Sequence, residues 1–122
     1  MSRRILVVED TEDNRQIIRD LLTSFDYELI EAVDGAEGVA MAETHHPDLI
    51  LMDILLPVLD GYEATRRIRA IPELARVPIV AVTSYALSGD EAKTREAGCD
   101  GYIAKPFSPR QLLAKVREFL PE

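Results

Sequence analysis

The chain has 122 residues, of which 47% are hydrophobic, and this size suits one core-forming domain over residues 1–122 with no output domain. The single cysteine excludes an internal disulfide, and no apolar stretch reaches the roughly 20 residues that a membrane span requires. The formal net charge of −8 argues against direct binding to nucleic acid, and we expect a cytoplasmic protein that does not insert into a membrane.

The first half of the chain alternates short apolar runs with amphipathic segments. Residues 4–8 form a β-branched run that indicates a buried strand, and apolar residues then recur at helical spacing over 17–25. Residues 27–32 indicate a second strand. Asp34 is a suitable N-cap for a helix that ends before Pro47.

The second half of the chain continues this alternation. Strands are predicted over 49–52, 77–82 and 101–104, and a helical pattern follows each of them. Gly98 indicates the end of the fourth helix through a left-handed cap, and Ser108 indicates the N-cap of the fifth.

Strict alternation of strands and helices predicts an α/β fold, with a doubly wound parallel sheet covered by helices on both faces. Five strands are too few for a closed eight-stranded barrel. Open sheets of this kind bind ligands beyond the carboxyl ends of their strands. If the protein has a site, we therefore expect unusual residues at these ends.

Four of the five predicted strands do end in such residues. Glu9 and Asp10 follow the first strand, Asp53 the third, Thr83 the fourth and Lys105 the fifth. Crowding three carboxylates is unfavourable unless a cation or protons relieve the repulsion. Oxygen ligands favour a hard ion, and Mg²⁺ suits a site that also holds phosphate. Beside such an ion Asp53 can act as a nucleophile, while Lys105 and Thr83 balance charge on a transferred phosphoryl group.

Short motifs surround these residues in chain order. They are Val8-Glu-Asp10, Leu51-Met-Asp-Ile-Leu-Leu-Pro57, Asp60-Gly-Tyr62, Ala81-Val-Thr-Ser84 and Ala104-Lys-Pro106. Together they resemble the receiver domains of bacterial response regulators, chemotaxis regulators among them, over essentially the whole chain. The resemblance implies a flavodoxin-like strand order 2-1-3-4-5. It also implies a phosphoacceptor domain of two-component or phosphorelay signalling, which is not an enzyme in the usual sense.

The resemblance assigns the phosphoacceptor and its metal ligands. Asp53 would accept a phosphoryl group from a phosphohistidine of a sensor histidine kinase or a histidine phosphotransfer protein. Mg²⁺ would be held by Asp10, by Asp53 and by the backbone carbonyl of Leu55, with Glu9 acting through a water. The modified surface would then control binding to a downstream protein that the sequence does not identify.

It also assigns residues that respond to phosphorylation. Lys105 would contact the phosphoryl group, and its bond to Pro106 would be cis. Thr83 and Tyr102 match a switch pair, in which the hydroxyl moves toward the phosphate and the aromatic ring turns inward.

Two variable positions of the family and one helix complete the expectations. Leu55 and Tyr85 stand beside the site, and because neither can readily orient a water, we expect slow loss of the phosphate. Asn14, Ile18 and Leu22 are the candidate contacts for docking a histidine-bearing partner. Core packing is the alternative for the two apolar residues of this set.

Other functions fit part of the pattern. A haloacid-dehalogenase-like phosphatase also combines Asp, Thr, Lys and Mg²⁺, but it needs a second Asp where this chain has Leu55. A pseudo-receiver would bind partners without phosphorylation, and it usually lacks an acceptor or a metal ligand. The sequence retains both, which favours the phosphoacceptor.

Overall fold

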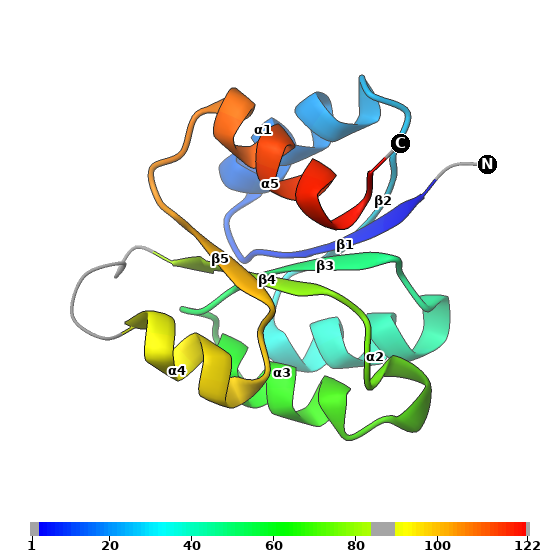
Figure 1. Ribbon diagram of the computed structural model, residues 1–122, viewed down its shortest axis with the longest axis vertical. Helices are drawn as coiled ribbons and strands as arrows, with labels where there is room; N and C mark the ends of the chain where they lie inside the picture. The colour runs from blue at the N-terminus through cyan, green and yellow to red at the C-terminus, as the bar shows by residue number, and fades with distance from the viewer. Residues whose placement is uncertain (1–2, 84–89, 122) are drawn as a thin grey trace.

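A five-stranded parallel sheet lies between two layers of helices in the computed structural model, which describes residues 3–83 and 90–121 (Figure 1). The strands are β1 (Arg4–Val8), β2 (Glu28–Ala32), β3 (Leu49–Asp53), β4 (Ile79–Thr83) and β5 (Gly101–Ala104). The helices are α1 (Glu12–Thr23), α2 (Gly35–His45), α3 (Gly61–Arg69), α4 (Asp90–Ala97) and α5 (Pro109–Phe119), with a short 3-10 helix, η1 (Pro72–Leu74), after α3. The strand order β2-β1-β3-β4-β5 confirms the predicted class and topology.

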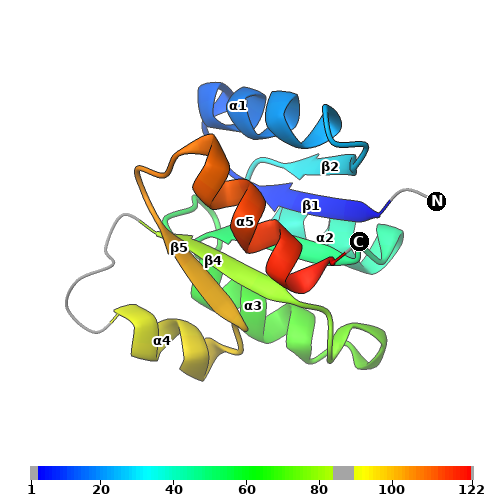
Figure 2. The same cartoon turned by 45° about the horizontal axis from the view of Figure 1, so that its top comes forward.

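Each face of the sheet packs against its own helices. Figure 1 shows α1 and α5 on one side and α2, α3 and α4 on the other, and the turned view of Figure 2 brings α5 in front of the sheet. On β1, Ile5 and Val7 pack with α1 and α5, whereas Leu6 and Val8 pack with α2 and α3. This double burial explains why the strands are apolar at successive positions. Within the described ranges, no helix has the length and apolar character that a bilayer span requires.

The ends of the elements agree closely with the sequence pattern. Ser108 and Gln111 form a capping box at the start of α5, and Gly98 has the left-handed φ of 110° expected after α4. Two strands begin later than predicted, β2 by one residue and β4 at Ile79. Pro78 accounts for the second difference, because proline has no N–H to donate to the neighbouring strand.

The strand register brings the carboxyl ends together. Val8 lies opposite Met52, Asp53 lies opposite Val82, and Thr83 lies opposite Ala104. The residues that follow these positions therefore emerge at the same edge of the sheet.

The start of α3 is built against this edge. Asp60 caps the helix by accepting a hydrogen bond from the Glu63 backbone N–H at 2.9 Å. At Gly61, an added Cβ would lie 2.2 Å from the backbone oxygen of Asp53 and 2.7 Å from Cα of Ile54. Only glycine allows the helix to approach the chain this closely. The Asp-Gly pair thus supports the backbone that carries Asp53.

Candidate functional site

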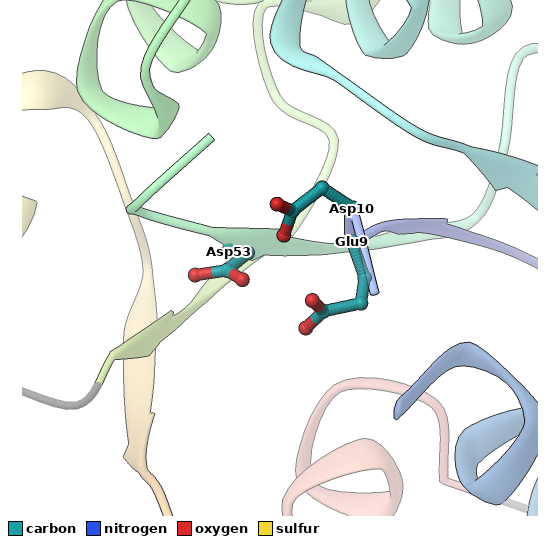
Figure 3. A group of neighbouring side chains, drawn as sticks. All are labelled: Glu9, Asp10 and Asp53. Atoms are coloured by element: carbon teal, nitrogen blue, oxygen red, sulfur yellow. The ribbon is translucent and has the colours of Figure 1, made fainter. Parts of the chain in front are cut away.

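Three carboxylates meet at the carboxyl edge of the sheet. Glu9, Asp10 and Asp53 each place a carboxylate oxygen within 4.8 Å of the others (Figure 3). Glu9 and Asp53 are almost completely buried, at 2% and 5% exposure, whereas Asp10 is exposed. The structure therefore brings together the three acidic residues that the sequence predicted at the ends of β1 and β3.

Lys105 connects two of these carboxylates. It follows β5, and its Nζ donates to Glu9 Oε1 at 2.9 Å and to Asp53 Oδ2 at 3.0 Å. Its backbone N–H donates to the Thr83 carbonyl at 2.7 Å, which ties the end of β5 to β4. Its peptide bond with Pro106 is cis, as the resemblance predicted.

Burial and mutual repulsion make the charge on Asp53 unfavourable. Burial, together with the nearby Glu9 carboxylate, raises the pKa of Asp53 to about 6, although Lys105 opposes this shift. Burial also acts to raise the pKa of Glu9, but hydrogen bonds from Lys105 and from the Thr11 backbone lower it overall. Burial disfavours the Lys105 cation, yet its bonds to the two carboxylates raise its pKa. A bound cation would relieve the repulsion that remains between Glu9 and Asp53.

The second oxygen of Asp53 is also held. Asp53 Oδ1 accepts a hydrogen bond from the Leu55 backbone N–H at 3.1 Å, while the Leu55 side chain is 54% exposed. The turn after β3 thus orients the carboxylate through the same residue whose carbonyl is the predicted metal ligand. That ligand role stays a prediction.

The predicted switch residues occupy neighbouring strands. Thr83 is the last residue of β4, next to β3, and is 1% exposed. Tyr102 lies on β5 opposite Ala81 and is half-buried against the core on the α3 side of the sheet. Their coupling stays a prediction. Tyr85, the second position expected to govern phosphate lifetime, lies outside the described residues.

A groove of about 530 Å³ opens beside the carboxylates. It is lined by Glu9, Asn14, Ile17, Ile18, Lys105, Pro106 and Phe107. One end of the groove is therefore formed by the site itself, and the remainder is largely apolar and lies between α1 and the segment that leads into α5.

The structure corrects part of the predicted docking set. Leu22 is completely buried in the core with α5, so its assignment as a docking contact is wrong. Ile18 is 3% exposed and belongs to the same core, reaching the groove only at its base. Asn14 does line the groove, and Ile17, which the sequence interpretation missed, is 55% exposed there. A signal for Ile17 was available in the sequence, because the apolar residues over 17–25 cover an arc of the helix that is slightly wider than one core-facing stripe.

Comparisons with known proteins agree with one another. The family model for the response regulator receiver domain matches residues 5–117. The polar-differentiation response regulator DivK of Brucella ovis is 41% identical over 120 residues, covering 98% of each chain. The receiver domain of the sensor histidine kinase PA1611 from Pseudomonas aeruginosa is 42% identical with a TM-score of 0.92, covering 100% of both chains. That structure has a magnesium ion coordinated in its active site cleft.

A more distant relative has the same fold. The chemotaxis protein CheY4 of Vibrio cholerae is 28% identical and superimposes with a TM-score of 0.93, covering 98% of this chain and 99% of its own. The likeness thus extends over whole chains and is not limited to the acidic edge.

Proposed function

This chain belongs to the response-regulator receiver family, and from that premise we propose that Asp53 is its phosphoacceptor. The observation that carries the proposal is the environment of this one carboxylate. Asp53 is buried at the end of β3, within hydrogen-bonding distance of Lys105 and beside two further carboxylates. Receiver domains are signalling domains, so a single transfer onto the chain, followed by slow loss, is the activity to expect.

The donor atoms fit Mg²⁺. Asp10, Asp53 and the Leu55 carbonyl would hold the ion directly, and Glu9 would act through a water. An all-oxygen set of this kind suits a hard cation. Burial, and after it the nearby Glu9 carboxylate, raises the pKa of Asp53, and a bound cation would offset both by favouring the ionised carboxylate. When bound, Mg²⁺ neutralises charge that develops on the phosphoryl oxygens. The magnesium in the related Pseudomonas domain supports this assignment.

The chain's own residues account for the transfer. An oxygen of the ionised Asp53 attacks phosphorus, the new O–P bond forms as the N–P bond of phosphohistidine breaks, and the electron pair returns to the imidazole. Lys105 already lies 3.0 Å from Asp53 Oδ2, so a small movement lets its ammonium contact a phosphoryl oxygen. The Thr83 hydroxyl would donate to another oxygen, and Tyr102 would then turn inward to change the surface that a downstream protein binds.

The phosphodonor would bind along the groove between α1 and the start of α5. Ile17 offers an exposed apolar side chain there, Asn14 offers a polar one, and the groove leads to Lys105. These features suit a helix of a histidine kinase or a histidine phosphotransfer protein that carries its phosphohistidine to Asp53.

We expect the phosphate on Asp53 to be lost slowly when no phosphatase is present. Leu55 presents an exposed apolar side chain beside the site, and this side chain cannot orient an attacking water. Measured loss within seconds in the unmodified protein would contradict this expectation.

Intact-mass spectrometry after incubation with acetyl phosphate and Mg²⁺ tests the assignment of Asp53. We expect one added phosphoryl group in the wild type and in Asp48→Asn, which alters an exposed carboxylate at the opposite edge of the sheet. We expect none in Asp53→Asn or in the presence of EDTA. Failure to bind either beryllofluoride or Mg²⁺ would instead favour a pseudo-receiver that binds partners without phosphorylation.

A further inference from the structure

The peptide that joins Glu9 to Asp10 is held by a side chain from α1. Arg15 Nη1 donates a hydrogen bond to the Glu9 carbonyl oxygen at 2.8 Å. Because the peptide unit is planar, the direction of this carbonyl constrains the orientation of both flanking residues. Arg15 therefore contacts the backbone from which two of the three carboxylates of the site project.

Arg15 is itself held on two further sides. Its guanidinium forms ion pairs with Glu12, in the preceding turn of α1, and with Glu31 of β2, whose Oε1 lies 3.3 Å from Arg15 Nε. Only 11% of the Arg15 side chain is exposed. Glu31 is fixed in turn by two hydrogen bonds from Arg19, at 2.7 and 2.8 Å, and these bonds keep its pKa below the ordinary value. The guanidinium thus has one well-defined position between α1, β2 and the acidic turn.

From this geometry we propose that Arg15 is a positioning residue for the cation site. Its guanidinium fixes the Glu9–Asp10 peptide, so that both carboxylates are oriented before the divalent cation binds. The inference rests on the proposed function, because it requires Asp10 and Asp53 to hold Mg²⁺. Ligands that are already ordered lose less conformational entropy when the metal binds. Replacing a group that orients a metal ligand commonly weakens metal affinity by roughly 10–100-fold.

The variants Arg15→Lys and Arg15→Met test the proposal in the full chain. Lysine keeps the positive charge but lacks the planar guanidinium that contacts the Glu9 carbonyl, Glu12 and Glu31 together. Methionine keeps an unbranched apolar side chain without the charge. Isothermal titration calorimetry with Mg²⁺ is expected to give a Kd about 10-fold higher for both variants than for wild type. At saturating Mg²⁺, phosphorylation by acetyl phosphate is expected to return close to the wild-type rate, because Arg15 does not contact the reacting groups.

Arg19→Lys is the matched control. It disrupts the paired hydrogen bonds to Glu31, yet within the described residues the Arg19 side chain bonds to Glu31 and Glu12 and not to Glu9, so the Mg²⁺ affinity of this variant is expected to stay within about twofold of wild type. Equal losses in Arg15→Lys and Arg19→Lys would overturn the proposal, since they would place the effect in the ion pairs with Glu31 and not in the bond from Arg15 to the Glu9 carbonyl.

A second variant, Glu31→Gln, keeps Arg15 but weakens its anchor. If the Arg15 variants do not fold, an Mg²⁺ affinity in Glu31→Gln that lies below that of Arg19→Lys supports the proposal, and an equal affinity overturns it. An unchanged Kd in folded Arg15 variants would overturn this inference alone. A wild-type protein that binds no Mg²⁺, or an Asp10→Asn variant that binds it as tightly as wild type, would overturn the proposed function and the inference with it.

Discussion

The charge of one carboxylate has opposing effects on function and on stability. As the proposed phosphoacceptor, Asp53 would have to be ionised to attack phosphorus, but its burial and the nearby Glu9 carboxylate raise its pKa from 3.8 to about 6. Between these two values the folded state binds more protons at this position than the unfolded state does. Stability of the cation-free protein therefore decreases as the pH rises from 3.8 to about 6 on account of Asp53, and the cost is fully present above that range.

Asp53→Asn should stabilise the cation-free protein at neutral pH. One pKa unit corresponds to about 1.4 kcal/mol, so we expect the free energy of unfolding to rise by about 1–3 kcal/mol at pH 7.5 in EDTA. The lower part of this range applies if Lys105 interacts less favourably with asparagine than with the carboxylate. Urea denaturation of both proteins measures the difference.

The pH dependence of this difference in unfolding free energy distinguishes an effect of the Asp53 charge from an effect of side-chain shape. The advantage of Asp53→Asn should shrink as the pH falls below about 6 and disappear below 3.8, where the wild-type carboxyl is neutral in both the folded and the unfolded state. A gain in Asp53→Asn that stays constant across this pH range would contradict the assigned cause.

At the scale of elements, α3 determines where the turn after β3 can lie. Gly61 N–H donates to the Ile54 carbonyl at 2.9 Å, and the helix start contacts the Asp53 backbone directly. The exposed loop between them includes Val58, a non-glycine residue with a left-handed φ of 69°. This loop is therefore constrained at both ends, and the position of the Asp53 carboxylate depends on the packing of α3.

Gly61→Ala should disturb both stability and the site. The new Cβ would lie 2.2 Å from the Asp53 backbone oxygen, so α3 or the end of β3 must move, and we expect the free energy of unfolding to fall by about 1–3 kcal/mol together with weaker Mg²⁺ binding. Gly101→Ala is the control, because its Cβ would meet only the Phe119 ring, at 3.2 Å, which can shift. Denaturation and Mg²⁺ titration of both variants measure the effects, and equal costs would argue against the close approach at Gly61.

In the whole molecule, the site joins four parts of the chain that are remote in sequence. Glu9 follows β1 and Lys105 follows β5, whereas Asp53 ends β3 and Thr83 ends β4. A cation bound there stabilises the entire fold, because the unfolded chain does not hold its ligands together.

Mg²⁺ should therefore raise the melting temperature of the wild-type protein. At a concentration 100 times the Kd, linkage gives about 2.7 kcal/mol, which corresponds to a shift of several degrees for a domain of this size. Thermal unfolding monitored by circular dichroism, with Mg²⁺ and then with EDTA, measures the shift. Asp10→Asn should largely lose it, and an equal shift in that variant would place the stabilising ion elsewhere.

The fold and most of the site could be predicted from the sequence. Apolar runs of strand length, alternating with helical patterns, require a parallel sheet covered on both faces, and the carboxyl ends of parallel strands share one edge. Glu9, Asp10, Asp53 and Lys105 could therefore be placed together before any distance was known. The helix caps at Asp34 and Ser108 were also readable, since they depend only on residues a few positions apart.

The side of α1 that faces solvent and the contacts across the site depend on how the elements pack, and the sequence pattern did not predict them. Leu22 is buried and Ile17 is exposed because of the rotation of α1 against β1 and α5, which a broad apolar arc does not specify. The link from Arg15 to the Glu9 carbonyl and the two bonds of Lys105 likewise depend on distances between packed elements. Local pattern specifies the elements, whereas these contacts arise only when segments remote in sequence pack together.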